Sequence, residues 1–365
     1  MTWLRAGIFK ASIGGENVIA DKRNGFTMVR LIAASLVIIT HTYVVLGLDH
    51  GDIFERNGLI GFSKIGVDAF FVISGYLVTL SMLRGQSLFT FFTNRVTRIF
   101  PGLFVSVLVT LLVLGLLAPS YSEYITQAET WQYLRNATLF DLHPFIPGVF
   151  TENAVQVVNG CLWTLPLEVL CYVGIMVLAW SRSFNWRFIL LAMLVMLTLH
   201  LHDTFMRDSY VFTVSKLFLN ELGYLFLYGA LLAHLKDKVY MSWFITIPAI
   251  AVIIWSFFNN GGDWHFSAGF YLVLWPYCLI SICVLAKKMS FLNRFDYSYG
   301  IYVYGFVIQQ VLASVFPSIT DVYVFTVLSL VLSVLAGAAS WHFVEKPALD
   351  MKKRYFSAAD SKVLA

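Results

Sequence analysis

Arg30 and His41 lie in one apolar stretch, VRLIAASLVIITHTYVVLGL, that is long enough to cross a bilayer as a helix. At about 100° per residue, the spacing from position 30 to position 41 returns to within about 20° of the starting direction. The two side chains therefore share one helix face, about 16 Å apart along the axis. If Arg30 lies at the membrane surface, His41 lies near the midplane. An imidazole at that depth is costly to keep and indicates a function, most simply as a general base.

Three carboxylates lie in the same apolar environment. Asp68 is in GVDAFFVISGYL, Glu168 is in LWTLPLE, and Glu221 comes early in a further apolar run. Ionisable groups inside membrane helices are rare and usually face the interior of the helix bundle. We expect all three to lie with His41 in the outer half of the membrane, with Pro166 kinking or unwinding the helix beside Glu168. The alternative is that they are hydrogen-bonding groups that hold helices together.

Arg95 and Arg98, in the run FFTNRVTRIFPG, are the next candidates. Residues three apart are neighbours on a helix, and the guanidinium fork suits bidentate binding of phosphate. With Arg30 they predict an anion-binding site on the cytoplasmic side. The alternative is that these arginines only mark the cytoplasmic ends of membrane helices.

The composition indicates which class of protein positions these residues. Hydrophobic residues make up 59% of the 365 residues and charged residues 13%, and the mean hydropathy is +0.75. A soluble protein of this length would carry more charge. No strongly basic face suggests nucleic-acid binding. We expect an all-α polytopic membrane protein with about ten transmembrane helices. The predicted spans lie near 28–47, 62–83, 96–118, 160–180, 186–202, 217–235, 241–258, 268–286, 297–316 and 322–343.

Most of the 25 lysines and arginines fall on one side of these spans, which predicts that both termini are cytoplasmic. We expect a cytoplasmic lead-in over 1–25, a transmembrane domain over 26–347 and a basic cytoplasmic tail over 348–365. The four cysteines form no CxxC pair, so we expect no metal site. The long connection 119–159 is expected outside, as a cap, as a sugar-stacking surface, or as a loop lying on the bilayer.

Several motifs together resemble the acyltransferase-3 family of membrane acyltransferases. They are Arg30 and His41 with ten residues between them, GVDAFFVISGYL, RVTRIFP, LWTLPLE and SYGIYVYG, and they extend from about Gly25 to Pro347. The order and spacing of these motifs are more specific than any one of them. The family often carries a His-Pro pair after the last motif, where this chain has Gly305-Phe306. A role for a histidine at that position is therefore not carried over.

The resemblance implies a ten-helix enzyme of the bacterial inner membrane. Such an enzyme moves an acyl group, usually acetyl, from cytoplasmic acetyl-CoA or another acyl-CoA to a carbohydrate hydroxyl. Acceptors of this class include lipopolysaccharide and exopolysaccharide, in some cases on a lipid carrier. The motifs of the family map onto Arg30, His41, Asp68, Arg95, Arg98 and Glu168, and we add Glu221, Trp163 and Ser74 as further candidates. Together these residues fall into three sets. The catalytic set is His41, Glu168 and Asp68; the donor-binding set is Arg30, Arg95 and Arg98; the substrate-binding set is Glu221, Trp163 and Ser74.

Two questions stay open at the level of sequence. His41 could act as a general base, which we favour, or carry the acyl group transiently. The chain could instead be a proton-coupled transporter or flippase that uses the buried acids and histidine as a relay. That class often shows inverted repeats, and none is visible here. A purely structural scaffold would leave the intramembrane charges unexplained.

Overall fold

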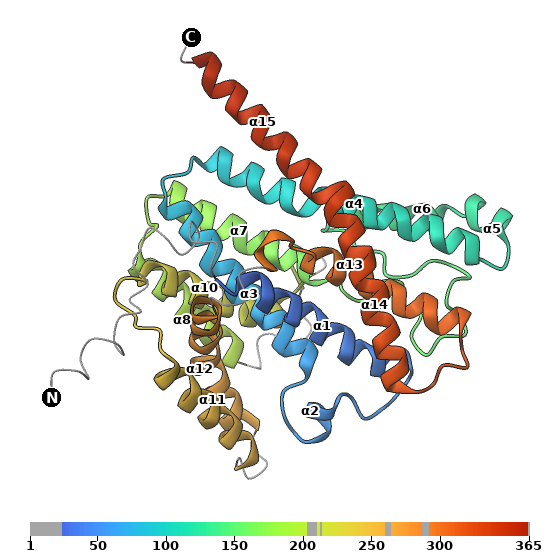
Figure 1. The fold of residues 1–365 in the computed structure, drawn as a ribbon, viewed down its shortest axis with the longest axis horizontal. Helices are drawn as coiled ribbons and strands as arrows, with labels where there is room; N and C mark the ends of the chain where they lie inside the picture. Colours follow the sequence, from blue (N-terminus) through green and yellow to red (C-terminus); the bar gives the residue numbers. More distant parts are fainter. Residues whose placement is uncertain (1–23, 203–209, 212–213, 260–263, 287–291, 364–365) are drawn as a thin grey trace. The chain divides into compact units, whose positions relative to one another are not determined.

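The structure is a computed structural model that describes residues 24–202, 210–211, 214–259, 264–286 and 292–363 (Figure 1). Each of the ten predicted spans contains a helix. The first elements are α1 (Phe26–Val45), α2 (Ile53–Arg56), α3 (Phe62–Leu83), α4 (Leu88–Leu117), α5 (Tyr121–Thr126), α6 (Ala128–Gln132) and the 3₁₀ helix η1 (Tyr133–Thr138). They are followed by α7 (Thr164–Trp180), α8 (Trp186–Leu201), strands β1 (Tyr210–Val211) and β2 (Val214–Ser215), and α10 (Lys216–His234). The last are α11 (Trp243–Phe258), α12 (Trp264–Leu285), α13 (Ser298–Val315), α14 (Val322–Ser340), the π-helical turn η3 (Trp341–Glu345) and α15 (Lys346–Val363).

The fold class is confirmed. Helices dominate, and the strands β1 and β2 form a short antiparallel hairpin that pairs Tyr210 with Ser215. Among the described residues, six helices are long and apolar enough to cross a membrane: Phe26–Val45, Phe62–Leu83, Leu88–Leu117, Lys216–His234, His265–Leu285 and Val322–Arg354. The helices α7, α8 and α11 are apolar but shorter. The predicted lead-in falls almost entirely outside the described residues, and the predicted tail forms most of α15.

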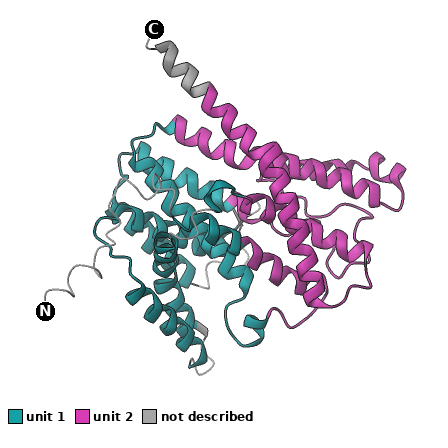
Figure 2. Ribbon diagram, viewed as in Figure 1, with its two compact units in different colours: residues 1–33, 53–88, 167–296 teal, residues 34–52, 89–166, 297–365 magenta. Residues whose placement is uncertain are grey.

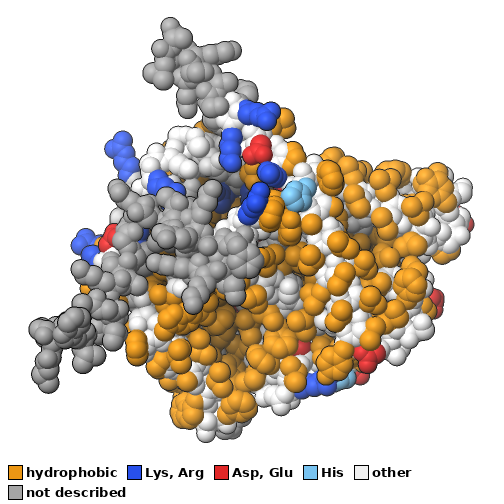
Figure 3. All heavy atoms as spheres, viewed as in Figure 1, with side chains coloured by type: hydrophobic (Ala, Val, Ile, Leu, Met, Phe, Trp, Pro, Cys, Tyr) orange, Lys and Arg blue, Asp and Glu red, His pale blue; other side chains and the backbone are white. Residues whose placement is uncertain are grey.

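Hydrophobic side chains cover much of the surface, as expected where lipid replaces water. Leu116, Trp180 and Phe343 are 82%, 76% and 81% exposed. Figure 3 shows hydrophobic side chains over most of the visible face, with several Lys and Arg side chains along α15 and others near the edges of the view. Soluble monomers rarely expose an apolar surface of this extent, which indicates contact with a membrane.

The beginning of α7 differs from the prediction. The apolar run suggested a helix from 160 that kinks or unwinds at Pro166, but residues 160–163 form turns and the helix begins at Thr164. Pro166 therefore lies in the first turn, where a backbone N–H has no intrahelical acceptor and proline is tolerated. Glu168 lies one turn from the helix start, closer to it than the prediction placed it.

The chain divides into two compact units (Figure 2). Unit 1 comprises residues 1–33, 53–88 and 167–296, and unit 2 comprises 34–52, 89–166 and 297–365. The boundary falls inside α1 and inside α7, so Arg30 and Glu168 belong to unit 1 and His41 belongs to unit 2.

Unit 1 is held together by close crossing of α3 and α10. A Cβ atom added at Gly75 would collide with the carbonyl oxygen of Phe226, and one at Gly229 with that of Val72. Glycine is needed at both positions because the two backbones touch. The rings of Phe26 and Tyr76 stack nearby, with centroids 5.7 Å apart.

Unit 2 uses the same principle between α13 and α14. A Cβ atom at Gly300 would lie 2.7 Å from the Cα of Gly337. Ser329 and Ser333 of α14 are fully buried and precede Gly337 at helical spacing, so α14 presents a stripe of small residues. Small residues let membrane helices approach closely and gain packing contacts where no hydrophobic driving force acts.

The segment 119–159 of unit 2 is ordered rather than a loose connection. The Tyr124 hydroxyl donates to the carbonyl of Leu111 in α4 at 2.8 Å, and burial raises the pKa of Tyr124 to about 12. Asn136 binds His143 twice, accepting from its backbone N–H at 2.9 Å and donating to its carbonyl at 3.0 Å. Leu139 and Phe150 both adopt positive φ, at 70° and 57°. Such backbone persists only where the surroundings enforce it.

Candidate active site

His41 lies in the second half of α1 and is partly exposed. Its Nδ1 lies 3.8 Å from the Sγ of Cys161, and its ring meets Phe306 edge-on with centroids 5.0 Å apart. Among the described residues, its Nε2 has no hydrogen-bond partner. The two neighbours fix the ring while one nitrogen remains available, which is the arrangement a general base requires.

The backbone around His41 is fixed by α13. Gln309 is fully buried, and its amide donates to the Ile38 carbonyl at 2.9 Å and to the Thr42 hydroxyl at 3.0 Å. On the other side, the Thr40 hydroxyl donates to the buried Asp52 carboxylate at 2.6 Å. The glutamine thus carries a structural role next to the position where the resembling family often has His-Pro.

Glu168 and Ser74 are brought together in unit 1. The Ser74 hydroxyl donates to Oε1 of Glu168 at 2.9 Å, and the Tyr172 hydroxyl donates to the same oxygen. Ser74 and Tyr172 also lie 2.8 Å apart. Because both donors meet Oε1, the second carboxylate oxygen remains a possible acceptor for another hydroxyl.

Asp68 and Glu221 are joined through Lys64. The Lys64 ammonium lies 3.0 Å from Asp68 and also pairs with Glu221. Tyr271 donates to Asp68 at 2.9 Å, and the Asp68 side chain is 1% exposed. One cation between two acids is the pattern that makes buried carboxylates tolerable. This network favours a structural role for Asp68, with Glu221 the more exposed of the two acids at 13%.

Arg30 lies in the unit 1 part of α1 and pairs with Asp296 at 3.0 Å. Its Nε is buried and has no hydrogen-bond partner in the described part of the chain. A guanidinium offers five N–H donors, so one carboxylate does not exhaust it. The side chain has the spare donor expected of an anion-binding group.

Arg98 lies in unit 2 between aromatic rings and one acid. It donates to the buried Glu345 at 3.2 Å, and its guanidinium lies 5.7 Å and 6.0 Å from the ring centroids of Tyr299 and Trp341. Arg95, one turn earlier on α4, lies 5.7 Å from the Phe91 ring. The RxxR pair therefore shares one face of α4, as the spacing predicted.

Lys352 of α15 lies beside this pair. Its ammonium donates to the side chain of Asn94 in α4, and it lies close enough to Arg95 for the two charges to repel. A concentration of positive charge of this kind attracts anions.

Trp163 lies in the turn before α7 and is 38% exposed. Among the described residues, no group of three or more His, Cys, Asp or Glu is arranged to hold a metal ion. Arg30 and Glu168 belong to unit 1, whereas His41, Arg95 and Arg98 belong to unit 2. That Arg30 lies beside Arg95 and Arg98, and that His41 lies beside Glu168, stays a prediction.

A family model described as an acyltransferase domain matches residues 23–341, which is nearly the whole chain and includes the helices α1 to α14. The chain belongs to the acyltransferase-3 family. The protein is therefore an acyltransferase, as the motifs predicted, and the transporter and scaffold hypotheses lose their support.

Two relatives extend this result. The acyltransferase is 29% identical over 333 residues to an "O-acetyl transferase" of Shigella phage Sf6, covering 89% of this chain and 96% of the relative. It is 27% identical over 366 residues to "Nodulation protein 10" of Rhizobium leguminosarum bv. viciae, covering 90% of this chain and 94% of the relative. No solved structure matches the chain. The matches support an O-acyltransferase.

Sequence reasoning missed several partners of the candidate residues. Lys64 and Asp68, and Glu168 and Tyr172, are spaced i and i+4 on helices, so the spacing alone could have found them. Glu345 is 247 residues from Arg98, and no local pattern indicates that pair.

Proposed function

We propose that this acyltransferase moves an acyl group, most simply acetyl, from acyl-CoA on the cytoplasmic side to a hydroxyl of an exported or cell-surface carbohydrate. The name of the phage relative supports O-acetyl transfer. The observation that carries the proposal is His41, fixed by Cys161 and Phe306 with its Nε2 available, on the same helix as Arg30. We place the protein in a bacterial inner membrane.

His41 acts as general base in this proposal. A carbohydrate hydroxyl is a weak nucleophile at neutral pH, and a positioned imidazole accelerates its attack by about 10²–10⁴-fold. As the hydroxyl oxygen bonds to the thioester carbonyl carbon, its proton passes to Nε2 of His41. The carbon–sulfur bond then breaks, and the departing thiolate takes a proton from the imidazolium. Transient transfer of the acyl group to His41 itself is the other route.

Arg30, Arg95 and Arg98 hold the phosphates of the donor. The buried Arg30 Nε, which has no partner among the residues that the structure describes, supports this role, because a buried donor without an acceptor costs free energy. The two aromatic rings around Arg98 hold its guanidinium in place, and a guanidinium fork suits the oxygens of a phosphate. The length along α1 from Arg30 to His41, about 16 Å, is then spanned by the slim arm of the donor.

Glu168, Ser74, Glu221 and Trp163 serve the acceptor. The second oxygen of Glu168 accepts from a carbohydrate hydroxyl, with Ser74 and Tyr172 holding the first. Trp163 offers an exposed ring against which a sugar stacks. Asp68 supports the site through Lys64 and Tyr271.

The orientation follows from the basic residues. Both termini lie in the cytoplasm, with the lead-in over 1–25 and the tail over 348–365 on either side of the transmembrane domain. Arg95 and Arg98 then lie at the cytoplasmic side, where acyl-CoA is available.

The experiment compares ester content in surface and secreted polysaccharide, by mass spectrometry and NMR, across four kinds of cell. These are cells without the protein, cells with wild type, and cells with His41→Ala or His50→Ala at matched membrane levels. His50 is the control because it is an exposed histidine just after α1. We expect an ester with wild type and His50→Ala and none with His41→Ala. If wild type adds no ester and changes only glycan amount or export, the proposal is wrong.

A further inference from the structure

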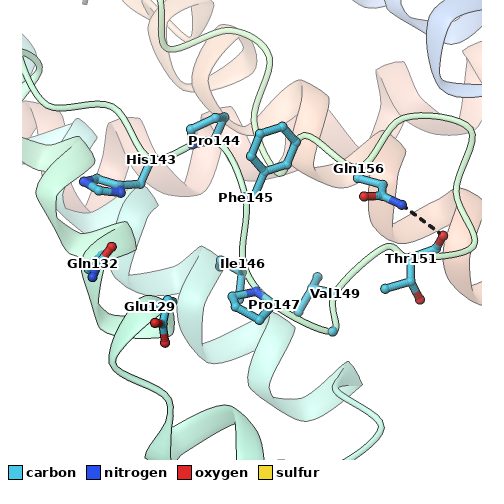
Figure 4. A pocket seen from close by; sticks show the side chains of 11 residues that line it. Glu129, Gln132, His143, Pro144, Phe145, Ile146, Pro147, Val149, Thr151 and Gln156 are labelled. Carbon is cyan, nitrogen blue, oxygen red and sulfur yellow. Dashed lines mark hydrogen bonds between the residues drawn. The ribbon is translucent and has the colours of Figure 1, made fainter.

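A pocket of about 330 Å³ lies in the segment 119–159 of unit 2, outside the candidate catalytic groups. Figure 4 shows Glu129 and Gln132 of α6 on one side of the chain segment 143–149 and Thr151 and Gln156 on the other. Its size is at the lower end of the range for small-molecule sites, about 300–1,000 Å³. It has room for a small ligand or for one unit of a longer one.

The lining suits a neutral polyhydroxylated ligand. Phe145 is 57% exposed and lies between Pro144 and Pro147, so one wall is flat and apolar. The C–H groups on one face of a sugar ring carry partial positive charge and stack on the negative face of an aromatic ring. The amides of Gln132 and Gln156 and the carboxylate of Glu129 offer donors and acceptors for hydroxyls.

The charges of the lining residues disfavour an anionic ligand. The lining residues include no Lys or Arg, and Glu129 contributes a negative charge. The phosphates of an acyl-CoA would find no cation among them. The ligand that this lining favours is a carbohydrate.

The walls are built before any ligand binds. His143 is fixed by the two backbone bonds from Asn136, and its Nε2 lies 3.2 Å from Asp141, which also pairs with Arg135. Gln156 donates to the Thr151 carbonyl at 3.3 Å, the dashed line in Figure 4. A preformed site binds at lower entropic cost than one that must be ordered.

The pocket is also connected to His41 within unit 2. The carbonyl of Pro144 in its wall accepts from the Val158 N–H at 2.8 Å. Val158 comes three residues before Cys161, so their Cα atoms lie at most about 11 Å apart. Cys161 contacts His41, and Asn159 between them donates to the Val303 carbonyl of α13 at 2.8 Å. A short stretch of backbone within unit 2 therefore joins the pocket wall to the residue that contacts His41.

We propose that this pocket binds one sugar unit of the acceptor glycan and so helps select which glycan is acylated. The inference rests on the proposed function, because it assigns the pocket to the same acceptor. Phe145 supplies the stacking surface, and Gln132 reads hydroxyls. Neither residue takes part in the chemical step.

The test uses the full-length protein in lipid nanodiscs. The binding probe is the deacylated surface polysaccharide of the source cells, cut to oligosaccharides and labelled at the reducing end, and acetyl-CoA is the donor. The variants are Phe145→Ala, Gln132→Ala and His41→Ala. Tyr121→Ala is the matched control, because Tyr121 is an aromatic residue of the same segment, 61% exposed and outside the pocket lining.

We expect Phe145→Ala and Gln132→Ala to bind the oligosaccharide about tenfold more weakly, with a raised KM for glycan and an unchanged kcat and donor KM. Tyr121→Ala should match wild type, and His41→Ala should bind glycan without transferring acetyl. Wild-type glycan affinity in both pocket variants, with transfer still lost in His41→Ala, overturns the pocket and leaves the proposed function standing. A wild-type protein that neither binds nor acetylates the oligosaccharide overturns both.

Discussion

His41 Nδ1 lies 3.8 Å from the Sγ of Cys161, while Phe306 packs edge-on against the same imidazole. Two elements distant in sequence, the turn before α7 and helix α13, thus fix one ring of α1. Gly160 extends this packing, because a Cβ atom there would lie 2.8 Å from the Phe306 ring. The contacts hold one side of the imidazole and leave its Nε2 available.

Phe306→Leu tests whether this packing positions the imidazole. The smaller side chain no longer fixes the ring, so we expect kcat for acyl transfer to fall by about tenfold with KM for donor and glycan unchanged. Steady-state kinetics in nanodiscs measures the split. Phe316→Leu, an exposed position at the end of the same helix, is the control. An equal fall in kcat in both variants would show that the effect is not specific to the contact between Phe306 and the imidazole.

Arg98→Ala tests the donor site in unit 2. The change removes a cation from the anion site, and we expect the KM for acyl-CoA to rise by about tenfold or more. It also takes the cationic partner from the buried Glu345, so the melting temperature should fall.

Arg98→Lys separates the two effects. It keeps the charge but not the fork, so we expect the donor KM to stay raised while most stability returns. Arg84→Ala, at an exposed arginine after α3, is the control. A donor KM at the wild-type level in Arg98→Ala would exclude Arg98 from the donor site.

Lys64→Met tests the three-charge network of unit 1. The change leaves Asp68 and Glu221 together without their shared cation, and we expect the variant to lose about 3 kcal/mol of stability. Adding Glu221→Gln should recover part of the loss, because one of the two like charges is removed. Thermal unfolding in detergent measures both. Additive losses in the double variant would contradict a shared network.

Gly75→Ala tests the crossing of α3 and α10. The added methyl group meets the backbone of Phe226, which cannot move away as a side chain could, so we expect a loss of about 1–3 kcal/mol or more. Gly174→Ala in α7 is the matched control, because nothing lies within 4 Å of its added Cβ atom. That change should be neutral or stabilising by up to about 1 kcal/mol. Equal stability of the two variants would show that the crossing is looser than described.

The apolar runs were sufficient to predict the helices, because each run must satisfy its backbone within itself in a membrane. The predicted span 62–83 coincides with α3. The predicted start of the α7 helix at residue 160 was wrong, because hydropathy does not distinguish an apolar turn from an apolar helix. In the structure the helix begins at Thr164, and Pro166 lies in its first turn.

The candidate site was predictable residue by residue but not in its contacts. Arg30, His41 and Arg98 stand out because ionisable groups are rare in apolar segments. The contacts of Arg98 with Glu345, of Gln309 with the Ile38 carbonyl and of His41 with Cys161 all join distant parts of the chain. Such pairs follow from tertiary packing, and no periodicity in one sequence contains them.

The central claim is that His41 is the base for acyl transfer, and its most direct measurement is the initial rate of radiolabelled acetyl transfer from acetyl-CoA to the oligosaccharide acceptor in nanodiscs. We predict that His41→Gln lowers this rate by about 100-fold or more at equal protein and equal glycan affinity, while His50→Gln keeps it. A His41→Gln rate within a few-fold of wild type would contradict the account.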